Sequence, residues 1–224
     1  TMAYKAESII AGEIGKFLMN GGLYRGSKPV MWSAVEKTAL AEAEIEYFDR
    51  RSTTIYARFP VRQTSHDLLR DAVIIIWTTT PWTMPGNRAT AYGADISYGL
   101  YHIPSTAEDS LAGTGERIVL ADDLAASVAE ACGLTGLDRI ADIAPDMFRD
   151  TVLAHPMADH GYDHDVPMLP ADYVTTDQGT GIVHIAPGHG AEDYVLGLAH
   201  GVPVPETIDA AGRVMAHLPI FAGM

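Results

Sequence analysis

Residues 72–89 read Ala-Val-Ile-Ile-Ile-Trp-Thr-Thr-Thr-Pro-Trp-Thr-Met-Pro-Gly-Asn-Arg-Ala, an apolar run that passes directly into a threonine-rich turn. The run at 72–78 is short and rich in β-branched residues, so we predict a buried strand there. Pro81 and Pro85 stiffen the turn, which suits the wall of a pocket. From the residues alone, an ordinary strand and tight turn explain the stretch equally well.

Runs of similar composition lie on both sides of this stretch. They predict further strands at residues 45–48, 53–61, 96–103, 117–121, 173–175 and 182–186. Apolar residues spaced by three and four predict a helix over 6–18, and two more helices are expected at 124–131, capped by Asp122 or Asp123, and at 191–200. Because strands and helices do not alternate regularly, we predict an α+β fold, a mostly antiparallel β-barrel with flanking helices.

Composition restricts the class of protein. The 224 residues carry 15 Lys and Arg against 29 Asp and Glu, a net charge of −14, which argues against broad contact with a nucleic-acid backbone. A nucleic acid could be touched only at a short single-stranded end. The single cysteine, Cys132, excludes a disulfide framework within the chain and favours a reducing cytoplasm. No apolar run approaches the ~20 residues that cross a bilayer.

A second chemically suggestive stretch is residues 179–194, Gly-Thr-Gly-Ile-Val-His-Ile-Ala-Pro-Gly-His-Gly-Ala-Glu-Asp-Tyr. It predicts a strand, a glycine turn and a helix, so that His184, His189 and Asp193 converge near one turn. A histidine in an apolar strand is more often structural than catalytic, and two histidines with an acid could bind zinc. No helical His-x-x-x-His pair accompanies them, and the turn lacks the ending of a P-loop. The residues alone leave the structural, catalytic and metal interpretations open.

Taken together, the two stretches resemble the editing domain inserted in the class I aminoacyl-tRNA synthetases for isoleucine, valine and leucine. The run Thr-Thr-Thr-Pro-Trp-Thr at 78–83 is similar to the isoleucine members, because the other two usually place Arg-Pro after the threonines. Residues 28–32 and 39–47 match the same enzymes just before the editing domain. The resemblance covers nearly the whole chain and divides it into a helical and connecting segment (1–44), a barrel core (45–205) and a return segment (206–224).

The chain departs from its relatives in three places. Ser33 and Glu36 occupy positions where some relatives carry Cys-x-x-Cys, so no zinc knuckle is expected. Gly86 stands where many relatives have alanine. The signatures of class I amino-acid activation are absent, so ATP and magnesium are expected to serve only a synthetic domain outside this chain. No cofactor and no metal is expected here.

The resemblance implies hydrolytic editing of valine misattached to tRNA(Ile). One missing methylene is worth only ~1–3 kcal/mol, so a synthetic site cannot reject valine well without a second, smaller pocket. Asp193 is expected to bind the α-ammonium, His184 to form the wall against isoleucine, and Asn87 to orient a water or the ester carbonyl. The expected catalytic residues are Asp193, Thr79, Asn87 and His184, and the expected substrate-binding residues are Thr78, Thr79, Thr80, Trp82, Thr83, His184, His189 and Asp193.

The expected partners are the 3′ acceptor end of tRNA(Ile) carrying valine and the rest of the synthetase, in a cytoplasmic monomer without membrane contact. Three alternatives remain. A valyl-tRNA synthetase editing domain that removes threonine is disfavoured by Pro81-Trp82. The others are a non-catalytic module that docks the acceptor end and a zinc hydrolase built on His184, His189 and Asp193.

Overall fold

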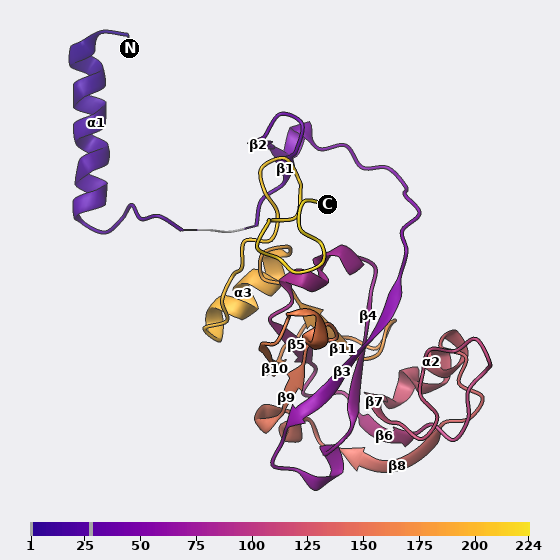
Figure 1. The fold of residues 1–224 in the computed structure, drawn as a ribbon. Coiled ribbons are helices and arrows are strands. Elements are labelled where there is room, and N and C mark those ends of the chain that lie inside the picture. Colours follow the sequence, from indigo (N-terminus) through magenta and orange to yellow (C-terminus); the bar gives the residue numbers. More distant parts are fainter. Residues whose placement is uncertain (1, 27–28) are drawn as a thin grey trace.

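The computed structural model describes residues 2–26 and 29–224, so Lys28 of the matched segment lies outside the described residues (Figure 1). The helices are α1 (Tyr4–Met19), α2 (Ala125–Ala131) and α3 (Ala191–Ala199). The main sheet contains β3 (Ile55–Gln63), β4 (Val73–Thr78), β5 (Ala89–Tyr92), β6 (Tyr98–His102), β7 (Arg117–Ala121), β8 (Asp138–Ile143), β9 (Val152–Ala154), β10 (Asp165–Pro170) and β11 (Ile182–Ile185). A separate hairpin is formed by β1 (Trp32–Ser33) and β2 (Thr38–Ala39). None of the described helices is long and apolar enough to cross a membrane.

The nine strands form one mixed sheet in the order β11-β5-β10-β9-β3-β4-β7-β6-β8. Neighbouring strands are antiparallel, except that β10 with β5 and β4 with β7 are parallel. The predicted α+β class and the largely antiparallel pairing are therefore confirmed. The predicted barrel is wrong, because within the described residues the two terminal strands, β11 and β8, do not pair with each other.

The sheet does not close into a barrel because β11, the first strand in the order, contacts β4 near the middle of the sheet and does not pair with β8, the last strand. β11 packs against β4 without pairing to it. The turn before β11 is joined to the end of β7 by a hydrogen bond of 2.9 Å from Ala121 N to Thr180 O. The sheet is thus curled so that β11 and the end of β7 come into contact. β8 does not take part in this contact and pairs with β6.

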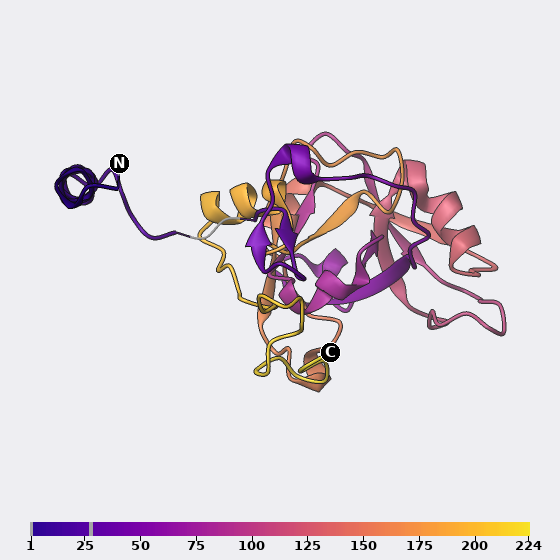
Figure 2. The same ribbon diagram turned by 90° about the horizontal axis from the view of Figure 1, so that it is seen from above.

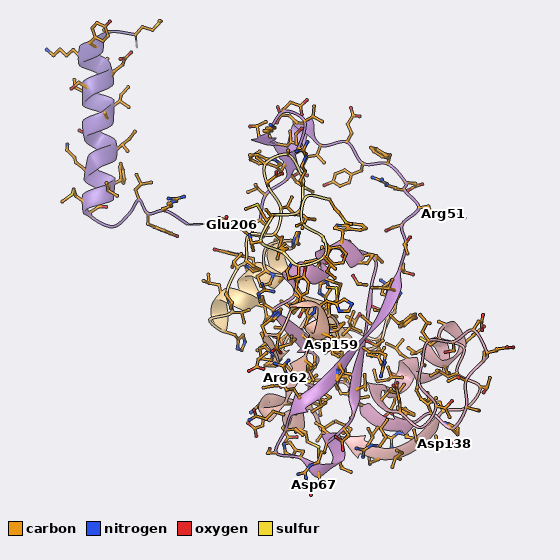
Figure 3. The ribbon with its side chains drawn as sticks, in the orientation of Figure 1. Arg51, Arg62, Asp67, Asp138, Asp159 and Glu206 are labelled. Carbon is orange, nitrogen blue, oxygen red and sulfur yellow. The ribbon has the colours of Figure 1, made fainter. Side chains whose placement is uncertain are left out.

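A continuous apolar core lies inside the curled sheet. Its fully buried members include Phe59, Ile74, Ile76, Leu100, Leu120, Phe148 and Leu153. Each such side chain stabilises the fold by ~1.5–3 kcal/mol relative to exposure. Among the described residues no Asp, Glu, Lys or Arg is buried, and Figure 3 shows the labelled Asp67 and Asp138 at the periphery. The net negative charge is therefore carried at the surface.

Most elements predicted from composition are present. All three helices and the strands near 53–61, 72–78, 96–103, 117–121 and 182–186 are confirmed within a few residues. Residues 45–48 form no strand because they pair with no strand among the described residues, and at 173–175 Tyr173 lies in a turn while residues 174 and 175 have no regular secondary structure. The predicted acidic cap of α2 is also wrong, since Asp122 and Asp123 lie in a separate 3-10 turn and neither side chain caps the helix.

Helix α1 has the predicted apolar spacing but buries none of its residues. Its apolar side chains are half or more exposed: Ile9, Ile10, Ile14, Phe17 and Leu18. Figure 2 views this helix along its axis, away from the sheet. The hairpin β1–β2 lies instead beside the C-terminal segment, because the Trp32 indole N–H donates to the carbonyl of Ala210 at 3.0 Å. Ser33 and Glu36 are hydrogen-bonded to each other across this hairpin.

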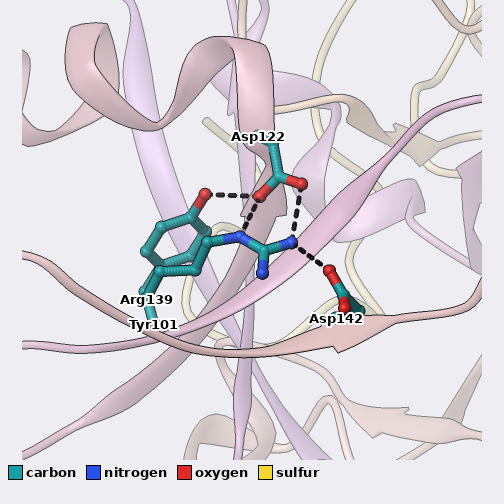
Figure 4. A network of polar contacts seen from close by, with 4 residues as sticks. All are labelled: Tyr101, Asp122, Arg139 and Asp142. Atoms are coloured by element: carbon teal, nitrogen blue, oxygen red, sulfur yellow. Dashed lines mark hydrogen bonds and ion pairs between the residues drawn. The ribbon is translucent and has the colours of Figure 1, made fainter.

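A polar network fastens β8 to the rest of the sheet (Figure 4). Arg139 in β8 donates from Nε and Nη2 to both carboxylate oxygens of Asp122, at 2.9 and 2.8 Å, and from Nη2 to Asp142 at 2.7 Å. The hydroxyl of Tyr101 in β6 donates to Asp122 at 2.5 Å. Because Asp122 follows β7 directly, the network joins β6, the end of β7 and β8.

Candidate functional site

A cavity of about 410 Å3 lies where β4 ends, β11 runs and α3 begins. Seven residues expected from the sequence line it: Thr78, Thr79, Thr80, Thr83, His184, His189 and Asp193. The two motifs meet because β4 and β11 pack together although they do not pair. The curl that prevents closure of the sheet therefore also builds this cavity.

The threonine turn supplies one wall. After β4 the chain enters the 3-10 turn Pro81–Gly86, and the Thr83 backbone N–H and hydroxyl both donate to the carbonyl of Thr80, at 2.9 and 2.8 Å. The Thr78 hydroxyl accepts from the Thr80 N–H at 3.1 Å. Thr79 is exposed, and its hydroxyl makes no hydrogen bond within the described residues. Thr78 and Thr83 thus hold the turn, and Thr79 offers a free hydroxyl to a ligand.

The glycine turn supplies the opposite wall and requires glycine at Gly181. This residue has a φ of +77°, and a Cβ there would lie 2.4 Å from the Cβ of Ala121. The hydroxyl of Tyr98 donates to the Gly181 carbonyl at 2.7 Å. Gly179 also has a positive φ of +86°, but a Cβ there would meet only Trp77 at 3.5 Å. The turn is therefore fixed against β6 and β7 at its second glycine.

His184 lies in β11 with only 7% of its surface exposed. Its Nε2 is 2.9 Å from the Thr83 hydroxyl, and its Nδ1 is 3.3 Å from the Asn87 amide nitrogen. Burial, followed by the charges of His155 and His189, lowers the pKa of His184 to about 4. The ring is therefore neutral near pH 7.

Asp193 is the third residue of α3, and its carboxylate faces back towards β11. Its Oδ2 accepts a hydrogen bond of 2.7 Å from the backbone N–H of Ala186. Burial raises the pKa of Asp193, the Ala186 hydrogen bond lowers it, and Glu192 raises it further, with a net shift upward. Among the described residues, Asp193 is the one acidic residue that lines the cavity, and no lysine or arginine lines it. The cavity is thus suited to a cation.

Two of the expected residues lie away from the cavity, and a third, His189, lines it. Trp82 is 61% exposed and does not line the cavity, and Asn87 is fully buried behind His184. His189 lines the cavity, with its Nε2 2.6 Å from the Thr207 hydroxyl. A Cβ on Gly86 would approach the His189 ring to 2.9 Å, so glycine at this position leaves room for that imidazole.

Other cavity residues were not anticipated from the sequence. They are Trp77, Tyr173, Thr175, Gln178 and Thr180, together with neighbours of the expected residues. Burial raises the pKa of Tyr173, and the negative charges of Asp193 and Glu192 raise it further, so its phenol stays protonated. The composition of residues 173–175 predicts a strand, and no local pattern indicates that the turn at Tyr173 faces the cavity.

A histidine pair also unanticipated from the sequence supports the threonine turn from behind. Nε2 of His155 is 2.9 Å from the Met84 carbonyl, and Nε2 of His164 is 2.9 Å from the Asn87 carbonyl. Burial is the largest cause that lowers the pKa of His155 to about 4. Because a carbonyl oxygen can only accept, both rings donate to it from Nε2 and so fix the backbone of the turn.

No group of three or more His, Cys, Asp or Glu among residues 2–26 and 29–224 is arranged to hold a metal ion. Both ring nitrogens of His184 are in hydrogen bonds, as is Nε2 of His189. A zinc site built on these histidines would have to replace those contacts.

Comparison with known proteins relates the chain to one family. The model of the tRNA synthetases class I (I, L, M and V) matches residues 1–185. The isoleucine–tRNA ligase of Gluconobacter oxydans is 47% identical over 226 residues, covering 100% of this chain and 24% of that protein. The isoleucine–tRNA ligase of Pelagibacter ubique is 46% identical over 223 residues, with the same two shares. The chain thus spans about a quarter of the length of the curated relatives it matches.

One solved structure is similar in fold. The crystal structure of GlLeuRS-CP1 aligns with a TM-score of 0.52 at 20% identity, covering 70% of this chain and 70% of that one. At this identity the likeness concerns the fold, which is thus similar to that of a CP1 domain.

Proposed function

The chain belongs to the class I tRNA synthetases for isoleucine, leucine, methionine and valine, and from this membership we propose that it is an editing domain that hydrolyses valine from mischarged tRNA(Ile). The identity of 46–47% to isoleucine–tRNA ligases supports tRNA(Ile) as the substrate. The partners under this proposal are the acceptor end of that tRNA and the rest of a synthetase. A non-catalytic docking module is the second candidate, and no contact in the cavity favours it.

The charge of the cavity is the observation that carries the proposal. An aminoacyl ester has a free α-ammonium, and among residues 2–26 and 29–224 Asp193 is the single carboxylate, without lysine or arginine, that lines the cavity. Its Oδ2 is held by Ala186, and its Oδ1 has no hydrogen bond within the described residues. A half-buried carboxylate with one free oxygen binds an ammonium through a charge-assisted hydrogen bond. Binding would also offset the desolvation that raises the pKa of Asp193.

The volume of the cavity suits an aminoacylated nucleoside, since small-ligand pockets span about 300–1,000 Å3. Within it, the free hydroxyl of Thr79 is placed to contact the terminal ribose or the ester carbonyl. His184 forms the wall against the amino-acid side chain. Its neutral ring adds bulk without adding charge, which suits discrimination between valine and the longer isoleucine.

The reaction needs no covalent intermediate on the protein. A water attacks the ester carbonyl carbon, the bond from that carbon to the ribose oxygen breaks, and the ribose oxygen takes up a proton. Holding the ester by its ammonium and ribose aligns the carbonyl for this attack. The hydroxyls of Thr78 and Thr83 form hydrogen bonds within the turn, and the proposed reaction uses neither as a nucleophile.

Deacylation by this chain tests the proposal directly. Valyl-tRNA(Ile) and isoleucyl-tRNA(Ile) are incubated separately with excess protein, and the remaining ester is measured over time. We expect valyl-tRNA(Ile) to be hydrolysed well above its spontaneous rate and isoleucyl-tRNA(Ile) to stay near its own. Binding of the acceptor end without hydrolysis of either ester would establish the docking module instead.

A further inference from the structure

We infer that Asn87 and Thr83 are positioning residues that hold His184 in one tautomer, with its proton on Nε2 and its Nδ1 bare. The inference deepens the proposed function and rests on it, because the fixed ring is the wall that would separate valine from isoleucine. It gives Asn87 a role different from contact with the substrate, which the buried position of this residue does not permit.

The orientation of the Asn87 amide is settled by its other neighbour. Its Nδ2 lies 2.8 Å from the carbonyl oxygen of Ala89, and only an N–H can face a carbonyl at that distance. The same NH2 group lies 3.3 Å from Nδ1 of His184. An amide nitrogen can only donate, so Nδ1 must be the acceptor and cannot carry the ring proton.

The position of the ring proton follows from the bare Nδ1. A neutral imidazole with a bare Nδ1 carries its hydrogen on Nε2, which is 2.9 Å from the Thr83 hydroxyl. That hydroxyl donates its own hydrogen to the carbonyl of Thr80 at 2.8 Å and therefore accepts from the ring. The hydrogen bonds run in one direction, from Asn87 through His184 and Thr83 to Thr80.

The surroundings of the ring oppose a second proton. His184 is buried, and the groups that act on its charge are two further histidines, His155 and His189. Neither would favour an imidazolium, and burial disfavours it as well. His184 is thereby excluded as a general base near neutral pH, because its one bare nitrogen is blocked by the Asn87 amide.

The unpaired oxygen of Asn87 supports a dedicated role for its NH2 group. Asn87 Oδ1 is buried and has no hydrogen-bond partner among the described residues. A buried carbonyl without a partner destabilises the fold and requires an explanation. The two donated hydrogen bonds, to Ala89 and His184, are the contribution that an apolar residue could not make.

The tautomer is measured by nuclear magnetic resonance on protein labelled with 15N in histidine, at pH 7 and without substrate. The signal of His184 is identified by its loss in His184→Gln. We expect a bare Nδ1 and a protonated Nε2 in the parent. In Asn87→Asp a carboxylate faces Nδ1, and we expect that nitrogen to become protonated. A parent ring protonated on Nδ1, or averaging between both forms, overturns the inference.

A matched pair at Thr83 tests the consequence for selectivity and decides the case if Asn87→Asp does not fold. Thr83→Ser keeps the hydroxyl and Thr83→Val removes it at nearly constant volume. We expect Ser to keep the parent ratio of valyl to isoleucyl hydrolysis and Val to lower it by about tenfold or more. Equal ratios in both variants overturn the inference. If neither ester is hydrolysed by the parent, the proposed function fails, and the resonance measurement still decides the tautomer.

Discussion

The backbone amide of Ala186, the residue after β11, donates a 2.7 Å hydrogen bond to Oδ2 of Asp193 in α3. This bond sets the orientation of the carboxylate, whose Oδ1 has no partner in the described residues. It also couples the strand that carries His184 to the helix that carries Asp193. The acid and the wall of the proposed site are therefore fixed relative to each other by one main-chain contact.

Asp193→Asn is expected to slow hydrolysis of valyl-tRNA(Ile) by about 30- to 150-fold, because a hydrogen bond to a charged group contributes ~2–3 kcal/mol. The amide oxygen can still accept from Ala186. Burial raises the pKa of Asp193, so its charged form is disfavoured in the folded protein, and the melting temperature at pH 7 should not fall. Glu192→Gln, a change in the exposed neighbour, serves as the control and should keep the parent rate. A single-turnover rate in Asp193→Asn close to the parent's would refute the assignment.

His184→Ala is expected to hydrolyse isoleucyl-tRNA(Ile), which we expect the parent to leave intact, because removal of the imidazole opens space for one more methylene. Hydrolysis of valyl-tRNA(Ile) should fall less. The variant also leaves Asn87 Nδ2 and the Thr83 hydroxyl short of a partner, so a lower melting temperature is expected in either case. The ratio of the two rates is therefore the deciding measurement, and an equal loss on both esters contradicts the wall.

Gly181→Ala and Gly179→Ala form a matched pair at the glycine turn. Both residues have a positive φ, which costs an L-residue about 1–2 kcal/mol. Only at Gly181 would the new Cβ also lie 2.4 Å from Ala121, inside a buried part of the sheet. Denaturant unfolding should therefore show a clearly larger loss of stability for Gly181→Ala. Equal losses would mean that the contact with β7 does not constrain the turn.

Arg139→Met is expected to lower the free energy of unfolding slightly at pH 7, since the Arg139–Asp122 pair is partly exposed and screened by solvent. Arg139 holds the pKa of Asp122 below its ordinary value of 3.8. The stabilisation is thus present above that ordinary value and is lost as the pH falls through the lowered one.

Denaturation midpoints measured from pH 7 downward check this prediction. The difference between the parent and Arg139→Met should stay constant to about pH 4 and then narrow. Asp142→Asn, at a side chain that is 92% exposed, should change stability little and provides the control. A difference that widens on acidification would contradict the assigned ion pair.

The sequence predicted the local elements better than their pairing. The apolar run before Thr78 and the run before Pro187 are contiguous strands followed by stiff turns, so their residues reach the cavity together. Strands β5, β8, β9 and β10 were missed, because runs such as Asp165–Pro170, with two prolines, lack the usual strand composition. Closure of the sheet depends on which strands, far apart in the sequence, pair with each other. No local pattern indicates that β11 contacts β4.

In the candidate site, too, the sequence indicated which residues belong to a motif but not where their side chains lie. Asn87 and Trp82 belong to the threonine-rich motif, yet the 3-10 turn directs Asn87 into the interior and Trp82 to solvent. Tyr173 reaches the cavity from a turn that precedes β11 and carries no motif of its own. Which face of a tight turn a side chain occupies depends on the dihedral angles of the turn, and residue types alone do not specify them.

An open sheet has two edge strands that a closed barrel lacks, and here they are β11 and β8, of which β8 lies farther from the candidate site. Within the described residues one side of this strand has no neighbouring strand, so its N–H and C=O groups could template the addition of a strand from another molecule. Asp138, Arg139 and Asp142 place charges along it, and Ile140 is its one strongly exposed large apolar side chain. Charged edges resist β-sheet aggregation, because a second copy would have to desolvate those groups. Arg139 and Asp142, which belong to the network that fastens β8, therefore also disfavour amyloid-like addition of strands at its free side.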